Sequence, residues 1–149
     1  MEIKKLNIGC GNDKREGYIN LDIEPVGDVQ RDIKRGLPFN DDSFDEVLVN
    51  NVLTQIASNE DFLFVMNEMW RVTKPEGAIL VRVPLASDIC SFQDPMDNRR
   101  FTEESFTYME WQHRRYVQYG RHYGFKPFKV LLRSNNGKQM EFRLKPIKI

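Results

Sequence analysis

The chain has 149 residues, of which 40% are hydrophobic and 30% charged, and its formal net charge is +0. This length fits one domain with one core, which we assign to residues 1–149. The balanced charge argues against nucleic acid as a partner, and no apolar stretch approaches the ~20 residues of a membrane helix. Two cysteines are too few for a disulfide framework and lack zinc spacing. The first residues lack the apolar centre of a signal peptide, so we expect a cytoplasmic protein without a metal.

The first half of the chain is predicted to form short strands joined by turns. Apolar runs indicate buried strands over residues 3–8, 18–21 and 44–50, and a short edge strand over 29–33. Parallel neighbours usually need a crossover of a dozen or more residues, and the first two connections are shorter than that. We therefore expect the N-terminal helices to be reduced or missing. One face of the sheet should be thinly covered, unless a later segment, the helix after Thr102 or a partner subunit fills the gap.

The second half predicts two helices and a hairpin. Apolar residues recur at helical spacing up to Val72, with Asn59 as the expected N-cap and Pro75 and Gly77 as the stop before a strand over 78–83. Thr102 is expected to cap a second helix, roughly over residues 103–119. An Asn-Gly pair between two alternating runs indicates a C-terminal hairpin. The expected fold is α/β, a Rossmann-like three-layer sandwich with a mostly parallel sheet and an antiparallel C-terminal hairpin.

A glycine loop and an acidic residue follow the first two strands. Gly9, Cys10 and Gly11 come directly after the first strand, and Asp22 ends the second. Glycines there let the backbone turn sharply and approach a ligand closely, and a carboxylate there can accept hydrogen bonds from both hydroxyls of a ribose. The full G-x-G-x-x-G pattern is absent, and Arg15 and Glu16 stand where its helix would begin. The pattern therefore argues against a dinucleotide such as NAD or FAD.

Four segments carry a more specific pattern in order along the chain. Residues 6–22 hold the glycine loop and Asp22; residues 37–45 read LPFNDDSFD; residues 68–77 read EMWRVTKPEG; residues 100–106 read RFTEESF. Together these segments resemble the corresponding blocks of compact class I S-adenosylmethionine-dependent methyltransferases of the type 11 kind. One block could arise by chance, whereas four in order span most of residues 6–106.

The resemblance implies S-adenosylmethionine as the cofactor. Asp22 would hold the ribose, the Asp32-Ile33 pair would lie near the adenine, and the end of the strand over 44–50 would contact cofactor or substrate. For Asp32 a solvated loop position is the alternative. The candidate cofactor-binding residues are Asn7, Gly9, Cys10, Gly11, Asp22, Ile23, Asp32, Ile33, Asn50 and Asn51.

The chain departs from the family where a catalytic base would stand. Asn51 and Gln55 replace two histidines that members often carry, and residues 94–97, Asp-Pro-Met-Asp, lack another. Asp94 and Asp97 are therefore the candidate catalytic residues, with a simple polar loop as the alternative. Arg99 and Arg100 could recognise a carboxylate or phosphate.

Three functions are compatible with this pattern. The first is a methyltransferase acting on a small-molecule or sugar-like acceptor. The second is a module that binds S-adenosylmethionine or S-adenosylhomocysteine without transferring a methyl group, as a partner or regulatory subunit. With either function the chain could form a homo-oligomer. The third, a nicotinamide-dependent reductase, is disfavoured by the truncated glycine motif.

Overall fold

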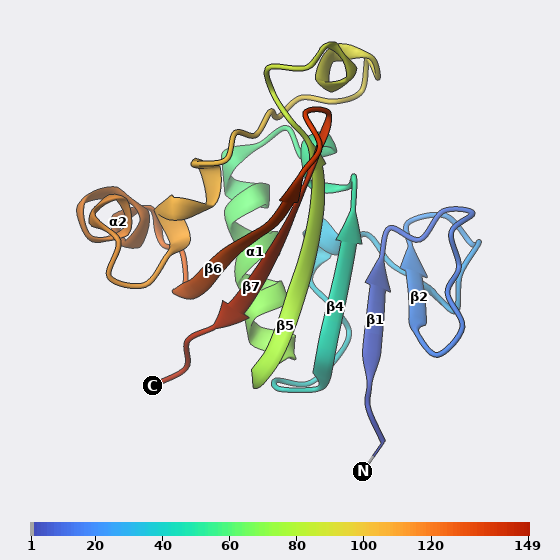
Figure 1. Ribbon diagram of the computed structural model, residues 1–149. Helices are drawn as coiled ribbons and strands as arrows, with labels where there is room; N and C mark the ends of the chain where they lie inside the picture. The colour runs from blue at the N-terminus through green and yellow to red at the C-terminus, as the bar shows by residue number, and fades with distance from the viewer. Residues whose placement is uncertain (1) are drawn as a thin grey trace.

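The computed structural model describes residues 2–149, and its centre is one seven-stranded sheet with the strand order β3-β2-β1-β4-β5-β7-β6 (Figure 1). Strands β1 to β5 pair in parallel, whereas β7 runs antiparallel to both β5 and β6. The mostly parallel Rossmann-like sheet and its antiparallel C-terminal hairpin are thereby confirmed. The strands are β1 (Lys5–Ile8), β2 (Ile19–Asp22), β3 (Val29–Gln30), β4 (Phe44–Asn50), β5 (Thr73–Pro84), β6 (Phe128–Asn135) and β7 (Gln139–Pro146).

Helical structure is sparse. The only long helix among residues 2–149 is α1 (Asn59–Val72), and none is long and apolar enough to cross a membrane. The remaining helical segments are α2 (Arg121–Tyr123), the 3-10 turns η1 (Ile33–Arg35), η2 (Leu53–Gln55), η3 (Ile89–Phe92) and η4 (Ser105–Met109), and the π-helical η5 (Tyr116–Gly120). The strong reduction of the N-terminal helices agrees with the short connections seen in the sequence.

The core lies between one face of the sheet and α1. Alternating residues of the central strands point to this face, and α1 places its apolar side against them. Burying each such side chain contributes roughly 1.5–3 kcal/mol. The fully buried members include Leu6, Ile8, Val47, Val49, Ile79, Val81, Phe142 and Leu144 from the sheet and Met66 and Met69 from α1.

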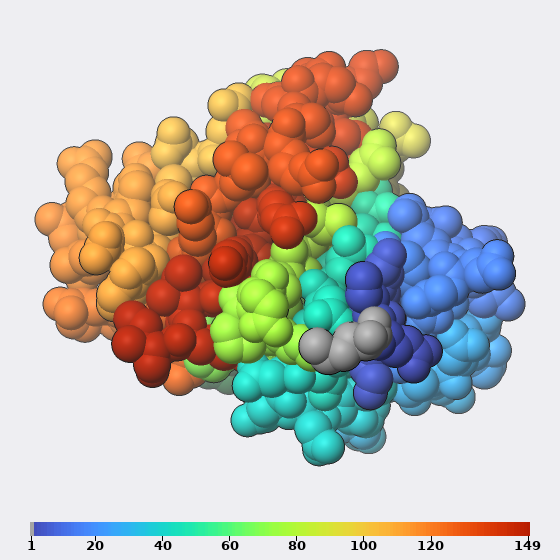
Figure 2. Space-filling model, turned by 60° about the horizontal axis from the view of Figure 1, so that its bottom comes forward, coloured from blue at the N-terminus to red at the C-terminus, as the bar shows by residue number. Residues whose placement is uncertain are grey.

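The opposite face of the sheet carries no helix among residues 2–149 (Figure 1). Arg82 of β5 and Arg143 of β7 are exposed there, and the neighbouring Leu131 of β6 is 57% exposed. The segment after Thr102 does not fill this gap, because Phe106 packs on the α1 side with its ring 4.6 Å from that of Phe142. The sheet therefore has a helical layer on one side only. Seen from below, the red C-terminal, green, teal and blue N-terminal segments lie side by side across the molecule (Figure 2).

The limits of α1 differ slightly from those predicted. Ser58, not Asn59, is the N-cap, and its hydroxyl accepts a 3.2 Å hydrogen bond from the Asp61 amide. At the other end the chain passes directly from α1 into β5, which includes Pro75 and Gly77. The register of β4 and β5 shifts here, and a bulge of this kind tolerates a proline. Pro75 and Gly77, which were expected to end the helix, thus lie within the first residues of β5.

The helix predicted over residues 103–119 was wrong. The chain forms η4 and then breaks, because Glu110 bridges to Phe128 and the Trp111 amide donates to the Phe128 carbonyl at 2.7 Å. Gln112 takes a φ of 67°, which no helix contains. Helical backbone resumes only at residue 114, so pairing with the start of β6 overrides the local helical pattern.

Candidate active site

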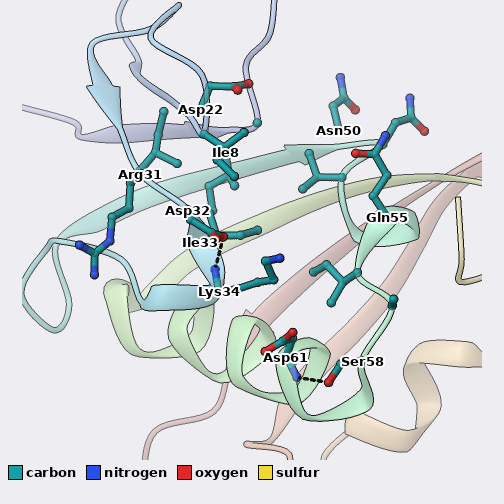
Figure 3. Close-up of a pocket in the computed structure, with 17 residues that line it drawn as sticks. Ile8, Asp22, Arg31, Asp32, Ile33, Lys34, Asn50, Gln55, Ser58 and Asp61 are labelled. Carbon is teal, nitrogen blue, oxygen red and sulfur yellow. Dashed lines mark hydrogen bonds between the residues drawn. The ribbon is translucent and has the colours of Figure 1, made fainter. Parts of the chain in front are cut away.

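A cavity of about 450 Å³ opens where β1, β2 and β4 end, with η1 and the start of α1 on its far side (Figure 3). Ligands of open α/β sheets bind at this carboxyl edge. The structure brings seven of the ten predicted cofactor residues to it: Gly9, Asp22, Ile23, Asp32, Ile33, Asn50 and Asn51.

Gly9 gives this cavity its tight inner turn. The residue has a φ of 67°, and its amide and that of Cys10 both donate to the Leu21 carbonyl, at 2.8 and 3.0 Å. A Cβ atom at position 9 would lie 2.3 Å from Cγ2 of Val52, which also lines the cavity. Only glycine fits both the backbone angle and this close approach.

Asp22 is held in place by the backbone of two loops. Its Oδ2 accepts a 2.9 Å hydrogen bond from the Gly11 amide, and its Oδ1 accepts one of 2.9 Å from the Glu24 amide. Each carboxylate oxygen has a second lone pair that remains available for a ligand. The carboxylate at the end of β2 is thus oriented before any ligand arrives.

Asn7, Cys10 and Gly11 do not line the cavity. The Asn7 side chain is buried and donates to the Asp13 carbonyl at 2.8 Å and to Oδ1 of Asn20 at 3.0 Å, so it braces the loop after β1. Cys10 is only 3% exposed, and burial, assisted by the charge of Asp22, raises the pKa of its thiol. These residues support the loop from behind the cavity, and Cys10 packs in its buried interior.

The far end of the cavity is built by η1. Oδ1 of Asp32 accepts a 3.0 Å hydrogen bond from the Lys34 amide and so caps this turn, while Ile33 packs partly buried against the core. Asp32 is therefore both a cap and a wall residue. The sequence reasoning missed further lining residues, which only the folded chain brings here: Ile8, Leu21, Arg31, Lys34, Val52, Gln55, Ile56, Ala57, Ser58 and Asp61.

The side chains of Asn51 and Gln55, which follow β4, lie at the boundary between two cavities. Asn51 has a φ of 52°, a backbone angle that asparagine adopts more readily than most residues. Its backbone amide donates to the Arg82 carbonyl at 2.9 Å. Gln55 follows on η2, and both side chains line the first cavity. Gln55 was not among the predicted cofactor residues. It was noted only because members of the resembled family often carry histidine at this position.

The second cavity has a volume of about 500 Å³ and shares Asn51 and Gln55 with the first. Asp94 and Asp97 both line it, so the predicted catalytic pair lies next to the predicted cofactor site. Oδ1 of Asp97 accepts a 2.9 Å hydrogen bond from the Thr54 hydroxyl, and Oδ1 of Asp94 accepts one of 2.9 Å from the Met96 amide. In each carboxylate the other oxygen has no partner among residues 2–149.

Arg99 and Arg100 lie elsewhere. The Arg99 guanidinium stacks 4.2 Å from the centre of the Phe62 ring and donates to the Ile56 carbonyl at 3.2 Å. The Arg100 guanidinium lies 3.9 Å from the centre of the Phe92 ring. Neither residue lines the two cavities, and His113 and His122 do not line them either.

The chain is similar to known methyltransferases in sequence pattern and in fold. The family model described as Methyltransferase domain matches residues 9–81. A S-adenosylmethionine-dependent methyltransferase from Methanosarcina mazei superposes with a TM-score of 0.62 at 17% identity, over 99% of this chain and 95% of that one. A S-adenosylmethionine-dependent methyltransferase from Archaeoglobus fulgidus gives 0.63 at 14% identity, over 96% and 86%. No curated protein matches the sequence.

A third similar structure is the complex between the Haloferax volcanii Trm112 methyltransferase activator and the putative methyltransferase. It has a TM-score of 0.59 at 17% identity and covers 97% of this chain and 83% of that one. The domain match and these neighbours support S-adenosylmethionine as the cofactor. The chain has the fold of the class I S-adenosylmethionine-dependent methyltransferases and carries their domain pattern over residues 9–81.

Proposed function

We propose that residues 1–149 act as one S-adenosylmethionine-dependent methyltransferase unit, which transfers a methyl group to a small-molecule or sugar-like acceptor. The observation that carries this proposal is the contact between two cavities. The first contains Gly9 and Asp22, the second contains Asp94 and Asp97, and Asn51 belongs to both. A methyl donor in the first cavity would thus face an acceptor in the second.

The first cavity suits the proposed cofactor chemically. Asp22 offers lone pairs on both oxygens to the two ribose hydroxyls, and Asp32 offers a carboxylate to an adenine amino group. Apolar side chains between them, such as Ile33 and Ile23, provide a surface for a flat ring. A volume of about 450 Å³ lies in the range of small-molecule sites.

The reaction needs little from the protein beyond position. A lone pair of the acceptor attacks the methyl carbon, the carbon–sulfur bond breaks, and its electron pair remains on the sulfur, which becomes a neutral thioether. A proton then leaves the acceptor. Well-oriented reactants gain roughly 7–11 kcal/mol relative to free ones, so alignment by the two cavities supplies much of the rate.

Asp94 and Asp97 are the proposed proton acceptors. Both lie on the segment that follows β5 and line the second cavity. The Thr54 hydroxyl orients Asp97, and the Met96 amide orients Asp94, so each carboxylate presents a fixed oxygen. Loss of either charge should lower the rate of methyl transfer while cofactor binding is kept.

Calorimetry with S-adenosylmethionine and S-adenosylhomocysteine tests the proposal, followed by mass spectrometry of a broad acceptor panel for a product one methyl group heavier. Binding of both nucleosides and at least one methylated product are expected. Absence of binding of either nucleoside at millimolar concentration contradicts the proposal. NADH serves as the control ligand, and its binding in their place would favour a reductase.

A second candidate is a cofactor-binding module that works only with a partner, including a second copy of this chain. The helix-free face of the sheet, with exposed Arg82, Arg143 and Leu131, favours it. The neighbour from Haloferax volcanii is itself described in complex with an activator. Nucleoside binding without any methylated product, together with a dimer or a stable complex in analytical ultracentrifugation, would select this candidate.

The free thiols of Cys10 and Cys90 accord with a reducing compartment such as the cytoplasm.

A further inference from the structure

The second cavity has an unusual chemical lining. It lies between the end of β5, the start of β7 and the segment that contains η3, which passes over the upper edge of the sheet in Figure 1. Its polar wall consists of two carboxylates and four side-chain amides, next to the Cys90 thiol. The carboxylates are those of Asp94 and Asp97, and the amides are those of Asn51, Gln55, Gln93 and Gln139. Among the described residues that line it, none is Lys, Arg or His.

The side-chain oxygen of Gln139 lacks a hydrogen-bond donor among the described residues. Its Oε1 is buried and has no hydrogen-bond partner within residues 2–149, although the residue itself lines the cavity. Nearly all buried polar atoms in proteins are paired, so such an atom calls for a missing donor. The last torsion of glutamine is broad, so rotation about it can turn Oε1 toward the cavity.

Two neighbouring cations, Arg99 and Arg100, are committed elsewhere, and Lys138, which precedes Gln139, does not line the cavity. The Arg99 guanidinium donates to the Ile56 carbonyl and to Oδ1 of Asn59, and the Arg100 guanidinium stacks on Phe92. A carboxylate or phosphate in the second cavity would therefore meet two carboxylates and no lining cation. An ammonium group there would be attracted by both carboxylates and would donate hydrogen bonds to acceptors that now lack them.

We infer that the second cavity binds an amine-bearing methyl acceptor and excludes acids and phosphates of similar size. Asp94 and Asp97 hold the ammonium group, and Gln139 accepts a further hydrogen bond. This inference rests on the proposed function, because it takes the first cavity as the cofactor site. It adds the charge of the acceptor, which neither the fold nor the domain match specifies.

The test uses glucosamine, glucose and glucuronate, which share one pyranose ring. Relative to neutral glucose, glucosamine carries an ammonium group in place of the C2 hydroxyl, and glucuronate carries a carboxylate at C6. Each is titrated into the full chain saturated with S-adenosylhomocysteine, and binding is followed by calorimetry and by NMR shifts of Gln139 and Gln55. Glucosamine should bind at least tenfold more tightly than glucuronate, with shifts at both glutamines. Equal or tighter binding of glucuronate, or no binding of any of the three, overturns the inference.

Variants that remove one charge test whether Asp94 and Asp97 cause the preference for glucosamine. Asp94→Asn and Asp97→Asn should each reduce the preference for glucosamine over glucuronate at least threefold. Asp88→Asn is the matched control, because Asp88 lies on the same segment, does not line the cavity and caps η3 through the Cys90 amide, which asparagine can also do. A preference unchanged in both cavity variants contradicts the inference.

Cofactor binding and the choice of acceptor can be tested independently of each other. If the chain does not bind S-adenosylhomocysteine at all, the proposed function fails, and the first cavity is not a cofactor site. If S-adenosylhomocysteine binds normally but glucosamine and glucuronate bind alike, only the assignment of an amine-bearing acceptor is lost.

Discussion

The backbone amide of Gly11 and Oδ2 of Asp22 are joined by a 2.9 Å hydrogen bond, which links the loop after β1 to the end of β2. The two features that define the candidate cofactor site are thus one hydrogen-bonded unit. The glycine loop fixes the carboxylate, and the carboxylate in turn closes the loop. A change in either part should therefore affect nucleoside binding.

Asp22→Asn tests this unit directly. The variant loses the negative charge and one of the two acceptor oxygens, and charged hydrogen bonds are worth roughly 1.5–3 kcal/mol each. We expect the Kd for S-adenosylhomocysteine, measured by calorimetry, to rise at least tenfold. Asp13→Asn, an exposed carboxylate outside the cavity, is the matched control and should leave the Kd unchanged. A Kd for Asp22→Asn within twofold of that of the unchanged protein would remove Asp22 from the site.

Gly9→Ala and Gly11→Ala form a second matched pair. Both glycines have positive φ, so both variants incur a left-handed backbone cost of roughly 1–2 kcal/mol. Only at position 9 does a Cβ also meet a neighbour, Cγ2 of Val52 at 2.3 Å, whereas nothing lies within 4 Å at position 11. Gly9→Ala should lower the Tm more than Gly11→Ala does, and adding Val52→Ala should restore part of the difference. Equal losses of Tm in the two single variants would contradict the packing explanation.

We expect Glu68 to stabilise the fold in a pH-dependent way. Its carboxylate accepts hydrogen bonds from Arg71, at 2.7 and 3.0 Å, and from the Leu37 amide at 2.9 Å, and these bonds hold its pKa below the usual range. A lowered pKa in the folded state means stability that is present above the ordinary glutamate pKa of about 4.3 and lost as the pH falls through the folded value.

Glu68→Gln should therefore cost about 1–2 kcal/mol of unfolding free energy at pH 7 and much less at pH 3, as measured by urea unfolding. Glu76→Gln, at an exposed position on β5, is the control and should change little at either pH. A difference between the unchanged protein and Glu68→Gln that is the same at pH 7 and pH 3 would show that the charge is not the cause.

Gly120→Ala separates packing from helix propensity. Gly120 has an ordinary helical backbone, with a φ of −58°, so alanine would by itself favour the helix by about 1 kcal/mol. A Cβ at this position, however, would lie 1.6 Å from the Tyr108 carbonyl oxygen. We expect a net loss of about 1–3 kcal/mol, seen as a lower Tm in thermal unfolding. Val117→Ala, at an exposed position on η5, is the control, and a higher Tm for Gly120→Ala would disprove the contact.

The strands were predictable because their signals are local. The run from Phe44 to Asn50 is apolar at its centre and bounded by turns, and β4 has these limits. The segment after Thr102 has equally good helical spacing, but its outcome depended on a distant strand. Glu110 and Trp111 pair with Phe128, and a hydrogen bond to residue 128 cannot be read from the residues around 110.

The order of the chemical groups at the strand ends could be predicted from the residues alone. A glycine loop follows the first strand, a carboxylate ends the second, and two asparagines stand at the end of the fourth. Glycines directly after a buried strand favour a sharp turn and close approach to a ligand, so the role of Gly9 could be predicted from its position. Only the fold places Asn7, Cys10 and Gly11 behind the cavity. Asn7 points to the opposite face of β1 from Ile8, Cys10 is buried in the loop after β1, and Gly11 contributes its amide to Asp22. The fold alone also joined Gln139 to Asp94 and Asp97, since antiparallel pairing of β7 with β5 brings residues from far along the chain to the same edge of the sheet.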